Sequence, residues 1–252
     1  MASLHGRHAL VTGGGRGIGR AIAAALTQAG AAVTIAGRGE AALAEAVGKG
    51  DAQGYVIADV TDAQAVDNGV KQAVAVRGPI DLLVANAGTA TARPFMKTTP
   101  DQFRDMFEVH VLGMMHPVQA VLASMTERGF GRIVAIASIV GLKASPNVSP
   151  YVTAKHAMVG LVRSIAVETA GSGVTANAVC PGFVDTDLIR APIEQLIANG
   201  MSRKDALARF TSRVPAGRFT RPEEVAEAVL YLCSPNAATV TGTTLVIGAE
   251  GP

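Results

Sequence analysis

The sequence predicts a single α/β domain in which a parallel sheet is covered by helices on both faces. The chain has 252 residues, 49% of them hydrophobic and 17% charged, which is enough for one sizeable core. Short apolar segments alternate with segments of helical periodicity along the whole chain. A glycine-rich turn joins the first apolar segment to the first helical one. Right-handed crossovers between parallel strands make such a sheet doubly wound.

The expected elements follow in order. About seven strands are predicted, at residues 8–12, 32–36, 54–58, 81–85, 132–137, 174–179 and 244–247. The first helix begins near Ala21 and stops near Gly30, and Asp62 caps a second that ends near residue 76. Further helices are expected over 101–126, where Pro117 should introduce a kink, from 151 onward, and over 223–233. Residues 187–213 are polar and helical in parts, which suggests a lid over a cleft.

Composition excludes several classes of protein. A net charge of +2 gives no basis for a nucleic-acid or membrane surface. There is no signal peptide in residues 1–7 and no apolar run of about 18 residues, so no membrane span is expected. Two cysteines, Cys180 and Cys233, form no disulfide framework, which fits a reducing compartment and predicts a cytoplasmic protein. No metal is expected.

The first strand, the glycine turn and the first helix form the start of a βαβ unit. Gly13, Gly17 and Gly19 let the backbone approach a pyrophosphate, and the helix N-terminus attracts its charge. The spacing differs from the general G-x-G-x-x-G pattern, and a merely flexible turn is the alternative. We therefore predict one Rossmann-type nucleotide-binding domain over residues 1–252.

The end of the second strand bears on the choice of cofactor. An NAD site usually places an acidic residue there, whereas an NADP site uses arginine near the 2′-phosphate. This chain has Gly37 and Arg38, with no acid before Glu40, and Arg16 of the glycine turn can reach the same phosphate. NADP (NADPH) is therefore favoured over NAD, the alternative being two solvated arginines.

Three side chains are expected to converge on one cleft. Ser138 ends the fifth strand, and Tyr151 and Lys155 lie four apart on one face of the following helix. A free tyrosine has a pKa near ~10, and an adjacent ammonium lowers it. Such a tyrosine can exchange a proton with a substrate oxygen that the serine hydroxyl also binds. The alternative is an amphipathic helix with these residues spaced by chance.

Taken together, these motifs resemble the short-chain dehydrogenase/reductase family, in family order across essentially the whole chain. The matching segments are Thr12-Gly13-x-x-x-Gly17-Ile18-Gly19, Asp59-Val60, Asn86-Ala87-Gly88, Ser138, Tyr151-x-x-x-Lys155, and Asn177-x-x-x-Pro181-Gly182 with Thr186.

The resemblance implies hydride transfer between a nicotinamide cofactor and a ketone or secondary alcohol. It implies that Tyr151 is the acid/base, that Lys155 lowers its pKa and binds the nicotinamide ribose, and that Ser138 orients the substrate oxygen. It also implies a homotetramer and a set of cofactor contacts: Gly13, Gly17, Ile18 and Gly19 at the pyrophosphate, Asp59 and Val60 by the adenine, Asn86 with Ala87 and Gly88 by the adenine ribose, and Val184 and Thr186, after Pro181 and Gly182, at the carboxamide.

Two positions depart from the family pattern. Ala85 stands where Asn is usual, and His110, in Val109-His110-Val111, replaces the catalytic Asn of the long helix. A histidine can donate and accept hydrogen bonds, so His110 can take over that role and can add a titration near neutral pH. The alternative is a packed histidine with no catalytic role. These departures keep open a catalytically silent cofactor-binding subunit.

The residues expected to line the substrate cleft are apolar and suit a bulky acyl or aromatic group, although several can simply pack under loops. The last third of the chain is similar to 3-hydroxybutyrate dehydrogenases and to 3-oxoacyl and polyketide ketoreductases. The first group typically has His and Lys where this chain has Val140 and Val148, so a small hydroxy acid is disfavoured. An NAD-dependent alcohol or 3-hydroxyacyl dehydrogenase working oxidatively stays an alternative. The expected lining residues are Phe95, Met96, Val140, Leu142, Val148, Phe183, Leu188 and Ile189.

Overall fold

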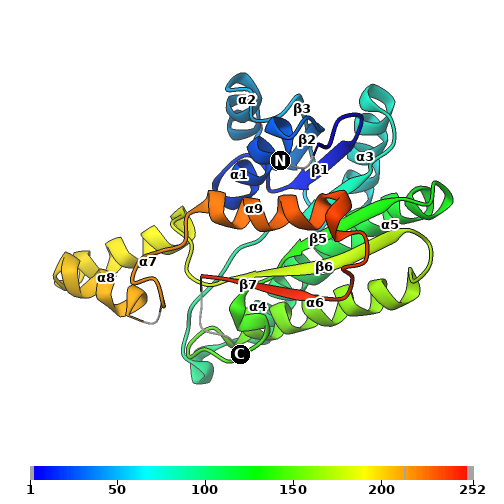
Figure 1. Ribbon diagram of the computed structural model, residues 1–252. Coiled ribbons are helices and arrows are strands. Elements are labelled where there is room, and N and C mark those ends of the chain that lie inside the picture. Colours follow the sequence, from blue (N-terminus) through cyan, green and yellow to red (C-terminus); the bar gives the residue numbers. More distant parts are fainter. Residues whose placement is uncertain (1–2, 213, 249–252) are drawn as a thin grey trace.

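A seven-stranded, all-parallel sheet forms the centre of the molecule, as the alternation of elements predicts (Figure 1). The computed structural model describes residues 3–212 and 214–248. The strand order is β3-β2-β1-β4-β5-β6-β7, which reverses direction between β1 and β4 and so creates a crevice at their carboxyl ends. The strands are β1 (His8–Thr12), β2 (Ala32–Gly37), β3 (Gly54–Ile57), β4 (Leu82–Ala85), β5 (Gly131–Ile136), β6 (Val174–Pro181) and β7 (Thr244–Ile247).

Helices cover both faces of the sheet. On one face lie α1 (Gly17–Gln28), α2 (Glu40–Gly48) and α9 (Pro222–Cys233). On the other lie α3 (Ala63–Arg77), α5 (Gly113–Glu127) and α6 (Ser149–Glu168), with α4 (Pro100–Phe107) packed against α6. Two further helices, α7 (Asp187–Ala198) and α8 (Arg203–Thr211), project from this body (Figure 1). They give the predicted lid its helical parts, while its last residue, Arg213, lies outside the described residues.

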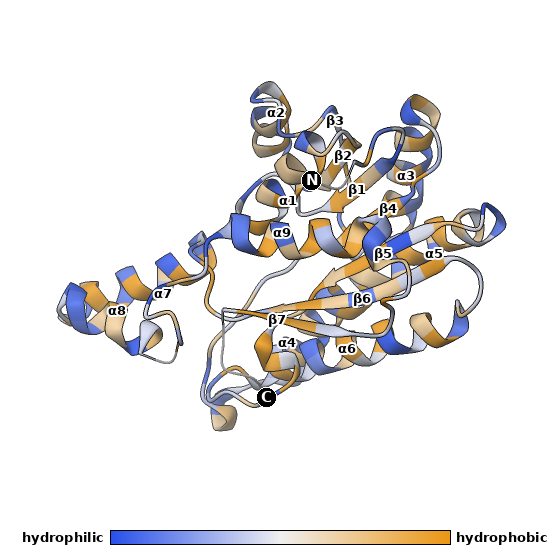
Figure 2. Cartoon of the chain, in the orientation of Figure 1, coloured by the Kyte–Doolittle hydropathy of each residue, from blue (hydrophilic) through white to orange (hydrophobic). Residues whose placement is uncertain are grey.

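Alternation along each strand builds two separate cores. In β4, Leu83 and Ala85 pack with α3, α5 and α6, whereas Leu82 and Val84 pack with α1, α2 and α9. Because both faces are buried, the strands are apolar at nearly every position. Figure 2 shows this apolar centre, with hydrophilic residues on the outer turns of the helices.

The structure differs from the expected elements in three places. Helix α2 was not expected, although its alanine-rich sequence has high helix propensity, and β6 extends two residues further, to Pro181. The long helix is irregular at a π turn, Glu108–Leu112, rather than at Pro117, which lies inside α5. Pro117 has no backbone N–H, so the carbonyl oxygen of Gly113, four residues earlier, has no helical donor. The π turn ends directly before Gly113.

The capping prediction for α3 is confirmed. The Asp62 carboxylate accepts hydrogen bonds from the backbone N–H groups of Gln64 and Ala65. Within residues 3–212 and 214–248, no helix combines the length and the apolar character that crossing a membrane requires.

Candidate active site

The residues predicted for the site gather at one edge of the sheet. The glycine turn follows β1, Arg38 follows β2, Asp59 and Val60 follow β3, and Asn86 follows β4. Ser138 follows β5, and the segment from Pro181 to Thr186 connects β6 to α7. This is the carboxyl edge, where an open parallel sheet binds its ligands.

The glycine turn is built for close backbone approach. Gly13 has φ 66°, and a Cβ there would lie 2.8 Å from Nδ2 of Asn86. A Cβ on Gly19 would overlap the carbonyl oxygen of Gly13. In the described part of the chain, the N-cap residue Arg16 makes no side-chain capping bond, so the first N–H groups of α1 are left for an anion. These features fit a dinucleotide pyrophosphate.

Thr12 and Asn86 hold the turn against β4. Oγ1 of Thr12 accepts hydrogen bonds from the backbone N–H groups of Asn86 and Ala87, at 3.0 and 3.1 Å. The Asn86 amide donates to the carbonyl oxygens of Thr12 and Gly13. Asn86 therefore orders the turn through its own side chain. The sequence analysis did not assign a site role to Thr12, and its place directly before the first glycine was the available signal.

The two arginines predicted to bind a 2′-phosphate are both exposed, Arg16 in the glycine turn and Arg38 directly after β2. Arg16 is exposed and has no ion pair among the described residues. The Arg38 side chain is 77% exposed and lies 3.7 Å from the Asp59 carboxylate. Asp59 is held mainly by Thr61, whose backbone N–H donates to it, and this contact lowers the pKa of the carboxyl. Both guanidinium groups thus retain donors for a phosphate.

Of the remaining residues predicted to bind the cofactor, Val60 and Val184 are buried, and Thr186 faces the glycine turn. The carbonyl oxygen of Val60 is bonded to the His116 imidazole at 2.9 Å. Thr186 faces the glycine turn, because a Cβ on Gly17 would lie 3.4 Å from its methyl group. The segments after β1 and β6 therefore meet across one crevice.

Ser138, Tyr151 and Lys155 converge as predicted. The Ser138 hydroxyl is hydrogen-bonded to the Tyr151 phenol. Lys155, one turn along α6, is 3% exposed, and its Nζ lies 5.6 Å from the centroid of the Tyr151 ring. That ammonium donates to the carbonyl oxygen of Ile136 at 2.8 Å. The end of β5 thus anchors both the serine and the lysine.

Electrostatics at this group differ from the expectation that Lys155 lowers the Tyr151 pKa. Burial raises the pKa of Tyr151 to about 12, against a smaller lowering by the Ser138 hydrogen bond. Burial also lowers the pKa of Lys155 to about 7. Lys155 is therefore only partly charged at neutral pH, and Tyr151 stays protonated.

Cys180 is buried, as expected, but it also contacts the site. The backbone N–H of Ser138 bonds to its sulfur, and burial raises the pKa of the thiol to about 11. This contact joins the ends of β5 and β6 beneath the serine. The sequence offered no signal for it, since it depends on the pairing of two strands.

His110 lies inside the site. Its ring meets the Tyr151 ring edge to face, with centroids 5.3 Å apart and an interplanar angle of 73°. Burial lowers the pKa of His110 to about 3, with a further lowering by Lys155. The expectation of a titration near neutral pH is therefore wrong, because the imidazole is neutral throughout that range.

The apolar residues expected to line the cleft lie on loops around this group. Phe95 and Met96 form the tip of the loop after β4 and are 69% and 91% exposed. Phe183, beyond β6, meets Phe210 of α8 edge to face at 5.4 Å, which ties α8 to the body. Val140, Leu142 and Val148 are half-buried, and Leu188 and Ile189 begin α7.

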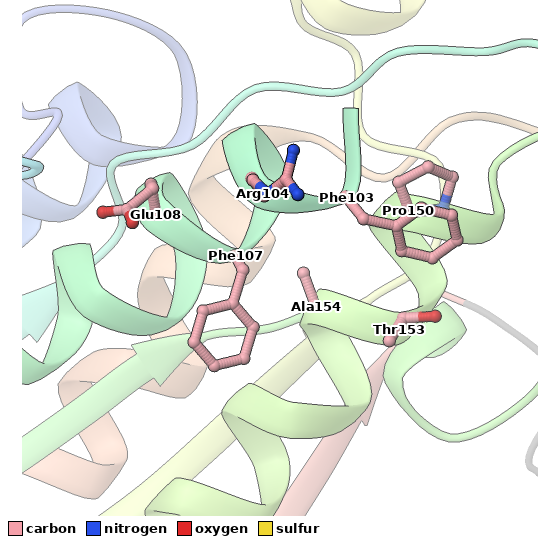
Figure 3. A pocket seen from close by; sticks show the side chains of 7 residues that line it. All are labelled: Phe103, Arg104, Phe107, Glu108, Pro150, Thr153 and Ala154. Atoms are coloured by element: carbon pink, nitrogen blue, oxygen red, sulfur yellow. The ribbon is translucent and has the colours of Figure 1, made fainter. Parts of the chain in front are cut away.

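A separate groove of about 290 Å³ lies between α4 and α6. Figure 3 shows side chains from both helices facing into it. Its lining is largely apolar and was not among the predicted substrate residues. The lining residues are Phe103, Arg104, Phe107, Glu108, Pro150, Thr153 and Ala154.

Comparison with known proteins agrees with this geometry. A family model described as enoyl-(acyl carrier protein) reductase matches residues 13–249. An acetoacetyl-CoA reductase of Rhizobium meliloti (strain 1021) is 37% identical, with 95% of each chain covered. A 3-oxoacyl-acyl-carrier-protein reductase of Vibrio harveyi is 37% identical, with 96% of each covered. The solved structure of an actinorhodin polyketide ketoreductase variant with NADPH superposes with a TM-score of 0.91 at 35% identity, covering 99% of this chain and 98% of that one.

The fold, the nucleotide crevice and the Ser–Tyr–Lys group define a nicotinamide-dependent oxidoreductase. The chain belongs to the short-chain dehydrogenase/reductase family, as the sequence motifs indicate. Within that family it is of the ketoreductase type.

Proposed function

We propose that this protein reduces bulky 3-oxoacyl or aromatic ketones with NADPH. The observation that carries the proposal is the hydrogen-bonded pair of Ser138 and Tyr151, with Lys155 one turn away, under a rim of exposed apolar side chains. The relatives named as acetoacetyl-CoA and 3-oxoacyl reductases support the same reaction class.

The protonation state of Tyr151 supports the reductive direction. With a pKa of about 12 the phenol carries its proton at neutral pH, so Tyr151 acts as a general acid toward a carbonyl oxygen. When bound, the reduced nicotinamide supplies the hydride to the carbonyl carbon. Ser138 holds the same oxygen through its hydroxyl. Lys155, which is partly charged at neutral pH, has its Nζ 5.6 Å from the centroid of the Tyr151 ring.

NADPH is the proposed cofactor because of the charge near the end of β2. Arg16 and Arg38 place two exposed guanidinium groups beside the turn. Among the described residues, Asp59 is the only acid paired with either of them, at 3.7 Å from Arg38. A phosphate dianion gains charge-assisted hydrogen bonds from this pair, whereas the bare hydroxyl of NADH does not. The similar ketoreductase structure with NADPH supports this choice.

A bulky substrate is proposed because the segments predicted to line the cleft carry large apolar side chains. Phe95 and Met96 are exposed on the loop after β4, and Phe183 follows β6. The loop between Ser138 and Tyr151 carries Val140 and Val148 where 3-hydroxybutyrate dehydrogenases typically have His and Lys, and its one charged residue is Lys143. Burying such groups on binding favours substrates with large apolar portions.

Binding and turnover together test the proposal. Purified protein is titrated with NADPH and with NADH, and then supplied with acetoacetyl-CoA, a longer 3-oxoacyl thioester and bicyclic or aromatic ketones. We expect tighter binding of NADPH and faster turnover of the bulky ketones. Preference for NADH would remove the arginine argument, and binding without turnover of any ketone would favour a silent cofactor-binding subunit.

We also propose a homotetramer. The groove between α4 and α6 is apolar, and Phe107 and Val167 expose large side chains on the same two helices. Packing this helical face against a second copy would cover it. Light scattering on the purified protein measures the assembly, and a monomeric mass at micromolar concentration would contradict it. We also propose a cytoplasmic location. Both cysteines are buried and unpaired, which supports a reducing compartment.

A further inference from the structure

His110 makes three contacts within the site. Its Nε2 lies 2.7 Å from the carbonyl oxygen of Thr89. Its ring meets that of Tyr151 edge to face. A Cβ on Gly88 would lie 2.7 Å from its Cε1, so the ring fits only against glycine. The side chain is 1% exposed and sits in the π turn of the long helix. Such turns are frequent at functional sites.

The hydrogen bond to Thr89 fixes the tautomer of the ring. A carbonyl oxygen can only accept, so Nε2 carries the proton and Nδ1 carries a lone pair. Nδ1 is buried and has no hydrogen-bond partner among the described residues. The low pKa of the imidazole agrees with this neutral form. His110 therefore has no proton to give toward the site, and its contribution is to hold neighbouring groups in place.

Thr89 begins the loop of residues 89–99, which we call the rim loop. A second hydrogen bond holds the same loop, from the backbone N–H of Arg93 to the carbonyl oxygen of Asn147 at 2.6 Å. Asn147 is in the left-handed region, with φ 63°, within the segment that joins Ser138 to Tyr151. The rim loop, which carries Phe95 and Met96 at its tip, is thus tied at two points, to His110 beside the Tyr151 ring and to the segment that joins Ser138 to Tyr151.

We propose that His110 is a positioning residue that couples the rim loop to the ring of Tyr151. Its imidazole holds the start of the loop through Nε2 and the tyrosine ring through edge contact. A ketone that packs against the loop tip is then aligned with the Tyr151 hydroxyl. This inference rests on the proposed ketone reduction and deepens it by linking substrate size to a residue outside the Ser–Tyr–Lys group.

The two functions of the ring can be separated by substitution. His110→Phe keeps an aromatic edge against Tyr151 and removes the donor to Thr89. His110→Gln keeps an N–H donor of similar reach and removes the ring. A third variant, Asn147→Val, disfavours the positive φ at the second tie and touches neither His110 nor Tyr151. Thermal unfolding of all three variants controls for loss of the fold.

Steady-state kinetics with a bulky and a small ketone distinguish these variants. We expect His110→Phe and Asn147→Val to raise KM for the bulky ketone by about tenfold and to change kcat by a smaller factor than KM. We expect His110→Gln to lower kcat by about tenfold with little change in KM. If His110 only supported the fold, both His110 variants would show the same fall in kcat and the same rise in KM. That result would overturn the proposal.

Hydrogen exchange gives a readout that does not depend on catalysis. Amides of residues 89–99 should exchange faster in His110→Phe than in the wild type and at near wild-type rates in His110→Gln. If the wild type reduces no ketone, the proposed function fails, yet this comparison still decides the coupling. Unchanged exchange over the rim loop in His110→Phe would overturn it.

Discussion

Replacing Lys155 with methionine should make the protein more stable, and the gain should depend on pH. Folding buries this amine and lowers its pKa from the ordinary 10.5 to about 7. At about 1.4 kcal/mol per pH unit, the difference corresponds to about 5 kcal/mol. The cost is fully present below pH 7, where both folded and unfolded chains are protonated. Above pH 10.5, where neither is, the cost is absent.

The direction of this pH dependence follows from the number of protons that the folded and the unfolded chain bind. Between pH 7 and 10.5 the unfolded chain holds a proton on this lysine that the folded chain has released, so the stability of the wild type rises with pH. Lys155→Met removes this titration, and it also removes the lowering that Lys155 exerts on the pKa values of His110 (about 3) and Cys180 (about 11), both of which lie outside the range from pH 7 to pH 9.5. The stability difference between variant and wild type should therefore shrink by about 3 kcal/mol between pH 7 and pH 9.5.

Urea unfolding followed by circular dichroism, at one protein concentration and several pH values, measures this difference. Lys155→Met also loses the hydrogen bond to the Ile136 carbonyl oxygen. The free energy of that bond is taken as the same at each pH, so it cancels when the stability differences at two pH values are compared. The exposed Lys204→Met serves as the control and should show no such trend. A stability difference for Lys155→Met that stays constant over this range would refute the burial argument.

Three further predictions concern the cofactor site and His110. Arg38→Glu should weaken NADPH binding by about tenfold to a hundredfold and leave NADH binding nearly unchanged, as measured by fluorescence titration, since only NADPH carries the 2′-phosphate. Gly19→Ala should abolish binding of both cofactors, because the added methyl group overlaps the carbonyl oxygen of Gly13; wild-type affinity would contradict the tight turn. The His110 imidazole should show no titration between pH 5 and pH 9 by nitrogen NMR, since its pKa is about 3; a midpoint near 6.5 would mean that it is not buried as described.

The fold could be predicted because its signals are local. The strand–turn–helix around Gly13 and Gly19 is encoded within a dozen adjacent residues, and the Tyr151–Lys155 spacing places both on one helix face by geometry alone. Helix α2 was not predicted, because its short alanine-rich sequence has high helix propensity but little amphipathic periodicity, with only Leu43 and Ala46 buried.

The electrostatics of the site could not be predicted, because they depend on contacts between distant segments. The Tyr151 pKa is set by burial under loops that only the fold brings together, and this burial outweighs the effect expected from Lys155. The neutral state of His110 is set mainly by burial, with a further lowering of its pKa by Lys155, which lies 45 positions later in the chain. Spacing in the sequence shows which residues share a helix face, but it gives no measure of desolvation.

Ser138, Tyr151 and Lys155 are proposed to carry out carbonyl reduction. The decisive measurement is the consumption of NADPH with a long 3-oxoacyl thioester, compared side by side for the wild type and Tyr151→Phe. We expect steady turnover by the wild type and a loss of at least about a thousandfold in kcat for Tyr151→Phe, with NADPH affinity retained. Equal rates for the two proteins would contradict the assignment of Tyr151 as the proton donor.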